Sequence, residues 1–377
     1  MSIELYDATL RDGMQGPGLT LSAAEKLRVA RKLDELGVHL IEAGFPASNP
    51  KELELFDLLA QERFEHAEVA AFGMTRRRGI AAADDAGLRV LVESFAPVCT
   101  IVGKTWALHL EKVVRVDRAE NLAMIAESVA FLVEAGKRVV YDAEHFFDGW
   151  RDDPAYALEC LRAAAGAGAE TVAICDTNGS SLPPQVVEAT AAVVAAVGDQ
   201  VRVAIHCHND AECGVANSLA AVEAGARQVQ GTMNGVGERT GNANLVSIIA
   251  NLQLKMGHRV LADEQLAHLT EAAHFVDELL NRPPNRSQPY VGRDAFAHKG
   301  GMHVAGVRAD SATFEHVDPA LVGNTRELLV SELAGRHTVA ERATEAGLDL
   351  DELAEDNLAK LLSRQDRGVL QGSGDAR

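Results

Sequence analysis

Short apolar runs alternate with amphipathic helical patterns along this chain from its first residues to about residue 256. Runs of strand length and composition lie at residues 3–10, 39–45, 68–73, 98–103, 138–144, 171–175, 202–205 and 228–232, with a weaker one within 87–93. Helical patterns separate the later runs, near residues 118–135, 154–167, 183–197, 213–225 and 243–256. Alternation at this spacing predicts parallel strands joined by right-handed crossovers.

Two folds satisfy this alternation, a closed (β/α)8 TIM barrel and an open doubly wound sheet. The barrel needs eight strands, so one candidate between residues 68 and 103 is expected to be wrong. No G-x-G-x-x-G motif follows an early run, as a dinucleotide-binding open sheet would require. Polar residues recur where the runs end, at Arg11, Glu42, Glu144, Asp176, His206 and Asn234. Barrels place their chemistry at these strand ends, so we favour the barrel.

The pattern changes after Gly257. Residues 262–281 are predicted to form one amphipathic helix, and residues 287–340 carry a second set of polar and glycine-rich motifs. A charged helix is expected at about 350–364, before a frayed tail. We therefore expect a barrel domain over residues 1–256, a small, mainly helical accessory region over 257–340, and a terminal helix and tail over 341–377.

Composition limits the partners of the chain. Its 377 residues suit one barrel with an appendage, and its formal charge of −19 argues against nucleic acid and anionic membranes as partners. A local cationic pocket can still bind an anionic substrate. The five cysteines show no C-x-x-C spacing, and neither a signal peptide nor an apolar run of membrane-spanning length is present. These features predict a cytoplasmic enzyme.

One strand end carries a candidate metal site. His206 and His208 stand two apart after a strand-like run, so both imidazoles can face one divalent cation. Asp12, at the end of the first run, is an oxygen ligand suited to Mg²⁺, Mn²⁺ or Zn²⁺. Asn242 can add an amide oxygen, or instead cap the helix that follows it. An H-x-H pair alone is also compatible with two ordinary polar residues.

Other strand ends offer groups for binding and catalysis. Arg11 can polarise a carbonyl oxygen, or it can simply brace a loop by pairing with Asp12. Glu144 can orient a ligand or water, or serve as a structural anion. Thr177 can bind a substrate carboxylate, or form a turn before the helix that begins near Pro183.

The motifs resemble those of metal-dependent Claisen-condensing barrel enzymes, the isopropylmalate, homocitrate and citramalate synthases. Three carry the likeness in this order: Leu-Arg-Asp-Gly at residues 10–13, His-x-His-Asn-Asp at 206–210 and Gly-Glu-Arg-x-Gly-Asn at 237–242. Further stretches resemble the longer bacterial citramalate synthases, at residues 141–149, 297–303, 322–324 and 329–336. The likeness covers roughly residues 3–340.

The resemblance implies roles for matching residues. A divalent metal would be held by Asp12, His206 and His208, with Asn242 completing the shell. Arg11 would polarise the 2-oxo carbonyl, and Glu144 would position acetyl-CoA and the reacting groups. His303 would be a catalytic histidine that the accessory region contributes across a homodimer. Substrate binding would involve Arg11, Gln15, Glu42, His109 and Thr177.

The implied reaction joins acetyl-CoA to a 2-oxo acid, with pyruvate as the first choice and citramalate and CoA as products. The alternatives are a synthase for 2-oxoisovalerate, 2-oxoglutarate or a substituted pyruvate, and a barrel without activity that serves as a binding subunit. A lyase resembling hydroxymethylglutaryl-CoA lyase is a further rival. Those lyases carry a cysteine after the eighth strand, whereas residues 234–242 contain none. The family's usual regulatory domain is expected to be missing from this chain.

Overall fold

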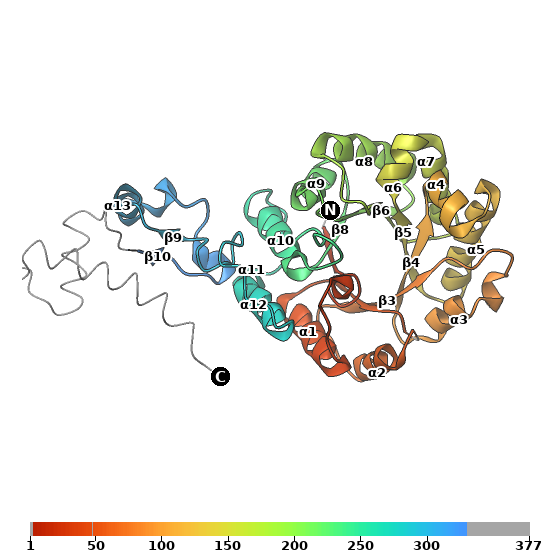
Figure 1. Ribbon diagram of the computed structural model, residues 1–377, viewed down its shortest axis with the longest axis horizontal. Coiled ribbons are helices and arrows are strands. Elements are labelled where there is room, and N and C mark those ends of the chain that lie inside the picture. Colours follow the sequence, from red (N-terminus) through yellow and green to blue (C-terminus); the bar gives the residue numbers. More distant parts are fainter. Residues whose placement is uncertain (1–2, 47, 330–377) are drawn as a thin grey trace, which may run out of the picture. The chain divides into compact units, whose positions relative to one another are not determined.

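The computed structural model describes residues 3–46 and 48–329 (Figure 1). Contacts divide the chain into two compact units, residues 1–284 and 285–377. The first unit therefore continues past residue 256, where the barrel domain was predicted to end. The alternation of strands and helices itself finishes close to that position, at Leu254.

Eight parallel strands form a closed barrel in the first unit. Each strand pairs with the next one along the chain, and β1 closes the barrel by pairing with β8 from Glu4↔Gln228 to Asp7↔Gly231. The strands are β1 (Glu4–Asp7), β2 (Leu40–Gly44), β3 (Glu68–Met74), β4 (Val98–Lys104), β5 (Arg138–Glu144), β6 (Thr171–Asp176), β7 (Arg202–Cys207) and β8 (Gln228–Gly231). The predicted (β/α)8 barrel is confirmed.

The surplus strand candidate, residues 87–93, is a helix. It forms α3 (Ala86–Glu93), whose first turn is capped by Asp85 through hydrogen bonds from the amides of Gly87 and Leu88. Leu88 and Leu91 are buried one turn apart, which is the helical period. The valines in this stretch favour a strand locally, but the cap and the buried stripe decide the structure.

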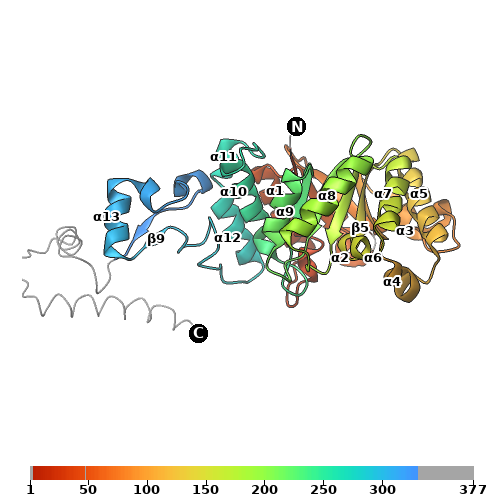
Figure 2. The same ribbon diagram turned by 90° about the horizontal axis from the view of Figure 1, so that it is seen from above.

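Helices surround the strands on all sides (Figures 1 and 2). The remaining ones around the barrel are α1 (Ala23–Leu36), α2 (Pro50–Leu59), α4 (Ala107–His109), α5 (Arg118–Glu134), α6 (Phe146–Asp152), α7 (Pro154–Gly166), α8 (Pro183–Val197), α9 (Gly214–Glu223) and α10 (Leu245–Leu254). In α1, Ser22 and Glu25 form a capping box, and Gly37 ends the helix with φ 89°. No helix in the described part of the chain is long and apolar enough to cross a membrane.

The barrel interior contains both apolar and polar side chains. Apolar side chains from neighbouring strands pack in one buried cluster: Tyr6, Ala8, Leu40, Ala70, Val98 and Val140. Buried polar groups include Asp12, Glu42, Asp142, His206 and His208, which lie along or just after the strands. Fixing polar groups on a rigid, dry scaffold is how a barrel builds a site at its carboxyl end.

The segment after the barrel contains two helices where one was predicted. Residues 262–281 form α11 (Asp263–Leu266) and α12 (Leu269–Leu279). The prediction of a single helix is wrong because the chain turns between them, where the amide of His268 donates to the carbonyl of Gln265, three residues back. In α12, Glu271 pairs with Lys32 of α1 at 2.9 Å, which ties this helix to the barrel.

The second unit contains short elements around one parallel strand pair. These are β9 (Ala297–His298), α13 (Gly301–Ala309), η5 (Ser311–Thr313), η6 (Pro319–Val322) and β10 (Glu327–Leu328). The side chain of Glu315 links His298 and Arg326, at 3.1 Å and 2.6 Å. The predicted terminal helix and tail, and the motif after residue 329, lie outside the described residues.

Candidate active site

Asp12, His206 and His208 meet at one point of the barrel. One ligand atom from each lies within 4.8 Å of the others, and all three side chains are buried. Asp12 Oδ2 is 3.3 Å from His206 Nε2 and 3.7 Å from His208 Nε2. The strand β7 produces this arrangement, because His206 and His208 point to the same side of the chain. The predicted convergence of the three side chains is therefore present.

Asn242, predicted as a further ligand, lies beside His208 and carries a buried amide oxygen. It pairs with His208 in a β-bridge, and its Nδ2 donates to the carbonyl of Val236 at 3.2 Å. That bond fixes the amide so that its buried Oδ1 has no hydrogen-bond partner among the described residues. A buried acceptor without a partner is costly unless a ligand completes it. Two imidazoles, a carboxylate and this oxygen fit a divalent cation.

The alternative role of Asn242 as a helix cap is not observed. Asn244 caps α10 instead, because its side chain accepts the amide of Val246 at 3.1 Å.

Charge around Asp12 keeps its carboxyl ionised. Burial alone would raise the pKa of Asp12, but the Arg11 guanidinium and hydrogen bonds from the two imidazoles hold that pKa well below its usual range. An ionised carboxylate is the form in which an aspartate binds metal.

Arg11 is clamped in place beside Asp12. Its Nε donates to Glu42 Oε2 at 2.6 Å, and its guanidinium carbon lies 3.9 Å from the centre of the Phe72 ring. Glu42 is completely buried and also accepts the hydroxyl of Tyr6 at 2.7 Å. Glu42, predicted to bind substrate, therefore has its two oxygens engaged by Tyr6 and Arg11.

Glu144, at the end of β5, forms an ion pair with Lys104 at the end of β4. The two residues are register partners in neighbouring parallel strands, and Thr105 donates to the Glu144 carbonyl at 2.6 Å. Lys104 was not predicted. A cation one residue beyond the predicted strand 98–103 was the available indication, since the ends of adjacent parallel strands lie side by side.

A stack of rings adjoins Glu144. His109 lies 4.2 Å from His145 and 5.3 Å from Trp106, measured between ring centres. Burial, together with the nearby charges of His145 and Lys104, lowers the pKa of His109. A predicted substrate-binding residue is thus a neutral imidazole at neutral pH.

Thr177, after β6, is oriented by the backbone. Its hydroxyl oxygen accepts the amide of His145 at 2.9 Å, so its own hydrogen can point to a ligand. Arg239 donates to the Thr177 carbonyl at 2.7 Å and binds Asp210, which links the loops after β6, β7 and β8.

The sequence prediction also missed a series of hydrogen bonds that joins His206, Gln230 and Asp142. Gln230 Oε1 lies 3.0 Å from His206 Nδ1, and Gln230 Nε2 donates to Asp142 at 3.1 Å. Burial, reinforced by the Glu42 carboxylate, raises the pKa of Asp142 to about 7. This series orients the His206 ring so that Nε2 faces Asp12, as a supporting contact does for a metal ligand.

Two predicted site residues stand apart from these contacts. Gln15 is exposed in the short helix η1 (Gly13–Gln15) after β1. His303 lies in the second unit, on α13, where its ring stacks on Phe314 with 4.2 Å between centres. The predicted contribution of His303 to the barrel site stays a prediction.

Two known protein families match this chain. Residues 2–276 match the HMGL-like family, and residues 290–366 match the homocitrate synthase post-HMGL domain-like family. The chain belongs to the HMGL-like family. The second match begins close to the boundary between the two compact units, at residue 285.

Several curated relatives of this HMGL-like chain are synthases. It is 48% identical to an (R)-citramalate synthase of Aquifex aeolicus over 93% of its own length and 66% of the relative. The (R)-citramalate synthase of Streptomyces coelicolor is 47% identical, with 93% and 65% covered. A 2-isopropylmalate synthase of Sulfolobus acidocaldarius is 35% identical, with 100% and 94% covered. The chain therefore spans about two thirds of the length of these citramalate synthases.

Solved structures of HMG-CoA lyases share the fold of this HMGL-like chain. The Pseudomonas aeruginosa lyase gives a TM-score of 0.63 at 18% identity, covering 75% of this chain and 94% of that one. The Brucella melitensis lyase gives 0.62 at 18% identity, with 74% and 99% covered. At this identity the likeness concerns the barrel alone.

Proposed function

We propose that the protein condenses acetyl-CoA with pyruvate to form citramalate and CoA. The observation that carries the proposal is the convergence of Asp12, His206 and His208 beside a clamped Arg11. The likeness to curated (R)-citramalate synthases at 43–48% identity supports the choice of pyruvate.

The residues around the candidate cation site have separate roles in the proposed reaction. A divalent cation held by Asp12, His206, His208 and Asn242 would supply Lewis-acid polarisation of the 2-oxo carbonyl. Arg11 donates to the same carbonyl oxygen and stabilises the negative charge that grows there as the new carbon–carbon bond forms.

Two further residues orient the substrates. The Thr177 hydroxyl donates to the carboxylate of the 2-oxo acid, since its oxygen already accepts the amide of His145. Glu144, fixed by Lys104, orients the acetyl group beside the 2-oxo carbon.

A base must take the α-proton of the thioester, which is a weak carbon acid. We assign this step to His303, contributed by the second unit of another copy in a homodimer. Attack on the 2-oxo carbon then gives a malyl thioester. Water cleaves this thioester to citramalate and CoA, which makes the overall reaction effectively irreversible.

The five cysteines are all free, which is in keeping with action in the reducing cytoplasm.

A panel of 2-oxo acids tests the proposal. Release of free CoA from acetyl-CoA is measured with pyruvate, 2-oxobutyrate, 2-oxoisovalerate, 2-oxoglutarate and glyoxylate. Pyruvate is expected to give the highest kcat/KM, with citramalate as the product. Release with 2-oxoisovalerate alone would replace the substrate and keep the mechanism. Cleavage of a 3-hydroxyacyl-CoA without condensation would contradict the proposal.

A second candidate is the condensation of acetyl-CoA with 2-oxoisovalerate. It is favoured by the Sulfolobus acidocaldarius 2-isopropylmalate synthase, because this chain covers 94% of that relative. The two substrates differ by the branched end of the 2-oxo acid. A pocket separates such groups by only about 1–3 kcal/mol per methylene, so the panel is needed to choose between them.

A further inference from the structure

Hydrolysis of the malyl thioester requires a group that takes a proton from water. His206 and His208 direct Nε2 toward Asp12, at 3.3 Å and 3.7 Å. Glu144 is paired with Lys104. Since these side chains are engaged by one another, the proton acceptor lies elsewhere in the site. A neutral imidazole is the group best matched to this task near neutral pH.

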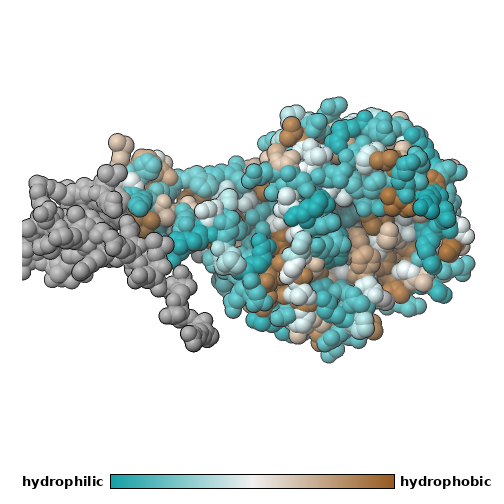
Figure 3. Space-filling view, in the orientation of Figure 1, coloured by the Kyte–Doolittle hydropathy of each residue, from teal (hydrophilic) through white to brown (hydrophobic). Residues whose placement is uncertain are grey.

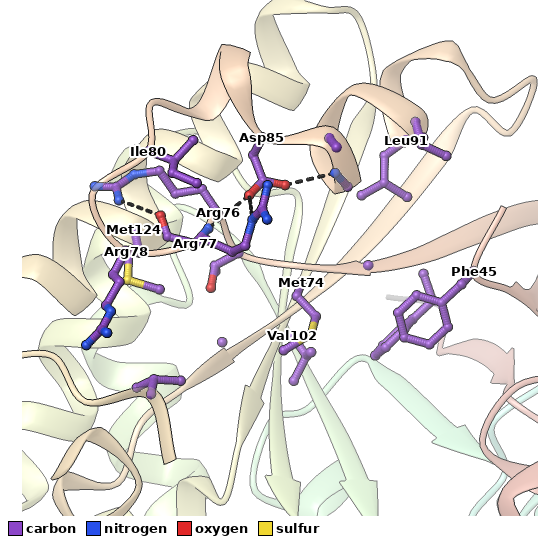
Figure 4. Close-up of a pocket in the computed structure, with 18 of the residues that line it drawn as sticks. Phe45, Met74, Arg76, Arg77, Arg78, Ile80, Asp85, Leu91, Val102 and Met124 are labelled. Atoms are coloured by element: carbon purple, nitrogen blue, oxygen red, sulfur yellow. Dashed lines mark hydrogen bonds and ion pairs between the residues drawn. The ribbon is translucent and has the colours of Figure 1, made fainter. Parts of the chain in front are cut away.

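The pocket beside the candidate active site offers no such group. About 780 Å³ opens there, with walls from β3, β4, α3, α5 and the loop that joins β3 to α3 (Figure 4). Met74 and Val102 lie in its middle, and Figure 3 shows hydrophobic residues gathered on this face over β3 and β4. The residues that line the pocket include no histidine and no glutamate, and its aspartate, Asp85, is paired with Arg77 at 3.1 Å. A base for water must come from another wall of the site.

His145 lies between two residues that are proposed to contact the substrates. It directly follows Glu144 at the end of β5, and its amide donates to the Thr177 hydroxyl oxygen at 2.9 Å. Its ring centre lies 4.2 Å from that of His109 and 5.8 Å from that of Trp106. The side chain is 12% exposed, so water can reach an imidazole that is otherwise enclosed.

The backbone turns at His145 and brings a carboxylate back to its ring. His145 has a left-handed conformation with φ 56°, which few residues other than glycine adopt. It ends β5 and precedes α6 (Phe146–Asp152), so Asp148 lies about one helical turn further on. His145 Nδ1 is 3.0 Å from Asp148 Oδ2. Backbone strain of this kind is concentrated at functional sites.

Asp148 is itself held in place. Asn178 Nδ2 donates to the same oxygen at 3.0 Å, and Arg151 donates to the other oxygen at 2.5 Å. Burial would raise the pKa of Asp148, but hydrogen bonds from His145 and Asn178, with the charge of Arg151, lower it. An ionised carboxylate only accepts hydrogen bonds, so the Nδ1 of His145 carries the hydrogen.

The second nitrogen of the His145 ring is therefore the basic one. In the neutral ring, a hydrogen on Nδ1 leaves a lone pair on Nε2, and no hydrogen bond of the described residues involves this Nε2. An imidazole oriented by a carboxylate in this way is suited to accept a proton from a nucleophile. His109 lacks this support, because its Nδ1 is buried without a partner in the described part of the chain.

We propose that His145, oriented by Asp148, is the general base that activates water to cleave the thioester. Nε2 takes a proton from water, the water oxygen bonds to the thioester carbonyl carbon, and the carbon–sulfur bond breaks. The imidazolium returns this proton to the departing sulfur, which leaves as the CoA thiol, and the new carboxyl group loses its remaining proton to solvent. Asp148 stabilises the imidazolium. The inference rests on the proposed function and assigns its second step.

Synthetic citramalyl-CoA tests the assignment, because this intermediate can react in two directions. Hydrolysis gives citramalate and CoA, whereas reversal of the condensation gives acetyl-CoA and pyruvate. His145→Asn should hydrolyse it about 100-fold more slowly, as loss of a general base predicts, and should still reverse the condensation. The ratio of citramalate to pyruvate should fall accordingly. Asparagine is the replacement because it tolerates left-handed backbone.

Two further variants complete the test. Asp148→Asn should shift the ratio in the same direction, because an amide does not stabilise the imidazolium. His268→Gln is the matched control, since His268 pairs with Glu271 at 3.1 Å with the same spacing along the chain, but both side chains are exposed. Its ratio should equal that of the wild type. A ratio of products does not change when part of a variant is misfolded, whereas a rate does.

The outcomes separate the base from the condensation. An unchanged ratio in His145→Asn would overturn the assignment, and so would an equal loss of both reactions, which would mean that His145 only supports the site. A wild type that does not hydrolyse citramalyl-CoA would also overturn it. If the wild type hydrolyses citramalyl-CoA but neither forms nor reverses it, the proposed condensation fails. Slower hydrolysis by His145→Asn than by His268→Gln would then still support the base, and equal hydrolysis would overturn it.

Discussion

At the scale of single residues, Arg11 shows how neighbours hold a side chain in place for its proposed catalytic role. Glu42 accepts its Nε, Phe72 supports the face of its guanidinium, and Asp12 lies 3.5 Å from it. Tyr6 holds the far oxygen of Glu42, so this carboxylate cannot turn away. A guanidinium fixed on several sides loses little freedom when it binds a substrate oxygen, and this preorganisation is what stabilises developing charge.

Removing that guanidinium should slow turnover. Arg11→Ala is expected to lower kcat by at least about 100-fold, as loss of an oxyanion donor does. The kcat of Arg11→Lys should lie between those of Arg11→Ala and the wild type, because lysine keeps the positive charge but lacks the planar guanidinium. Steady-state CoA release measures the effect, and thermal unfolding of both variants checks that Glu42 is tolerated without its partner. Normal turnover of a folded Arg11→Ala protein would remove Arg11 from the mechanism.

Sequence reasoning predicted those site residues whose role follows from their position in a motif. Asp12, His206 and His208 follow predicted strands, and parallel strands bring their ends together, so their convergence was foreseeable. Lys104 and Gln230 were missed for a physical reason. Their roles depend on which residue of a neighbouring strand lies opposite, and strand register is not encoded in a local pattern.

At the scale of elements, the loop after β8 holds Asn242 by its backbone geometry. Gly241 has φ 94°, and a Cβ at this position would run into the carbonyl of Gly235. The Gly241 carbonyl accepts the amide of Asn209, which ties the loop to the one that follows His208. A residue with a side chain cannot take this place without moving both loops.

Gly241→Ala should therefore weaken metal binding as well as stability. Gly257→Ala is the matched control, because Gly257 also has positive φ (72°) but a Cβ added there would meet no atom within 4 Å. The control should lose about 1 kcal/mol of unfolding free energy, the usual cost of left-handed backbone for alanine. Urea unfolding and a metal titration measure the two effects. Equal losses in both variants would contradict the crowding argument.

A helix cap explains why the one surplus strand candidate is a helix. Asp85 accepts the amides of Gly87 and Leu88 at the start of α3, and also the amide and Nε of Arg77. Burial opposes ionisation, but these hydrogen bonds outweigh it and lower the pKa of Asp85 below its ordinary value of 3.8. Periodicity could not identify this helix because it is short, whereas Asp85, directly before the first helical residue Ala86, was a usable cap motif.

Asp85 makes stability depend on pH in one direction. A pKa that is lower in the folded state contributes stability above the unfolded pKa, and this contribution is lost as pH falls through the folded pKa. Asp85→Ala should cost about 1 kcal/mol at neutral pH. Asp85→Asn keeps the helix cap but not the charge. The difference in unfolding free energy between this variant and the wild type should therefore shrink below about pH 4. Urea unfolding at several pH values measures it, with exposed Asp84→Asn as control. A difference that grows in acid would contradict the sign.

At the scale of the whole molecule, the proposed reaction uses both units of the chain. The barrel carries the candidate metal ligands and Arg11, and the second unit carries His303. The alternation of strands and helices, together with the polar residues at the strand ends, was enough to favour the barrel over an open sheet. Whether His303 of the second unit reaches a barrel depends on how the units assemble, which no local sequence pattern determines.

Complementation between inactive variants tests the shared site. Arg11→Ala and His303→Ala should each be nearly inactive alone. Mixed subunits should regain part of the activity, because one barrel of a mixed dimer has Arg11 and receives His303 from the other chain. CoA release after co-refolding measures the gain, and mixing each variant with itself is the control. If mixed dimers form and stay inactive, His303 does not act across subunits.

Binding of Mn²⁺ tests the central claim most directly, that Asp12, His206 and His208 hold one cation. Metal-free protein is titrated with Mn²⁺, and free Mn²⁺ is followed by electron paramagnetic resonance. The wild type and His66→Gln, which changes an exposed histidine, should each bind one Mn²⁺ per chain, and His208→Gln should lose that binding. Equal binding by His208→Gln and the wild type, or no stoichiometric binding by the wild type, would contradict the account.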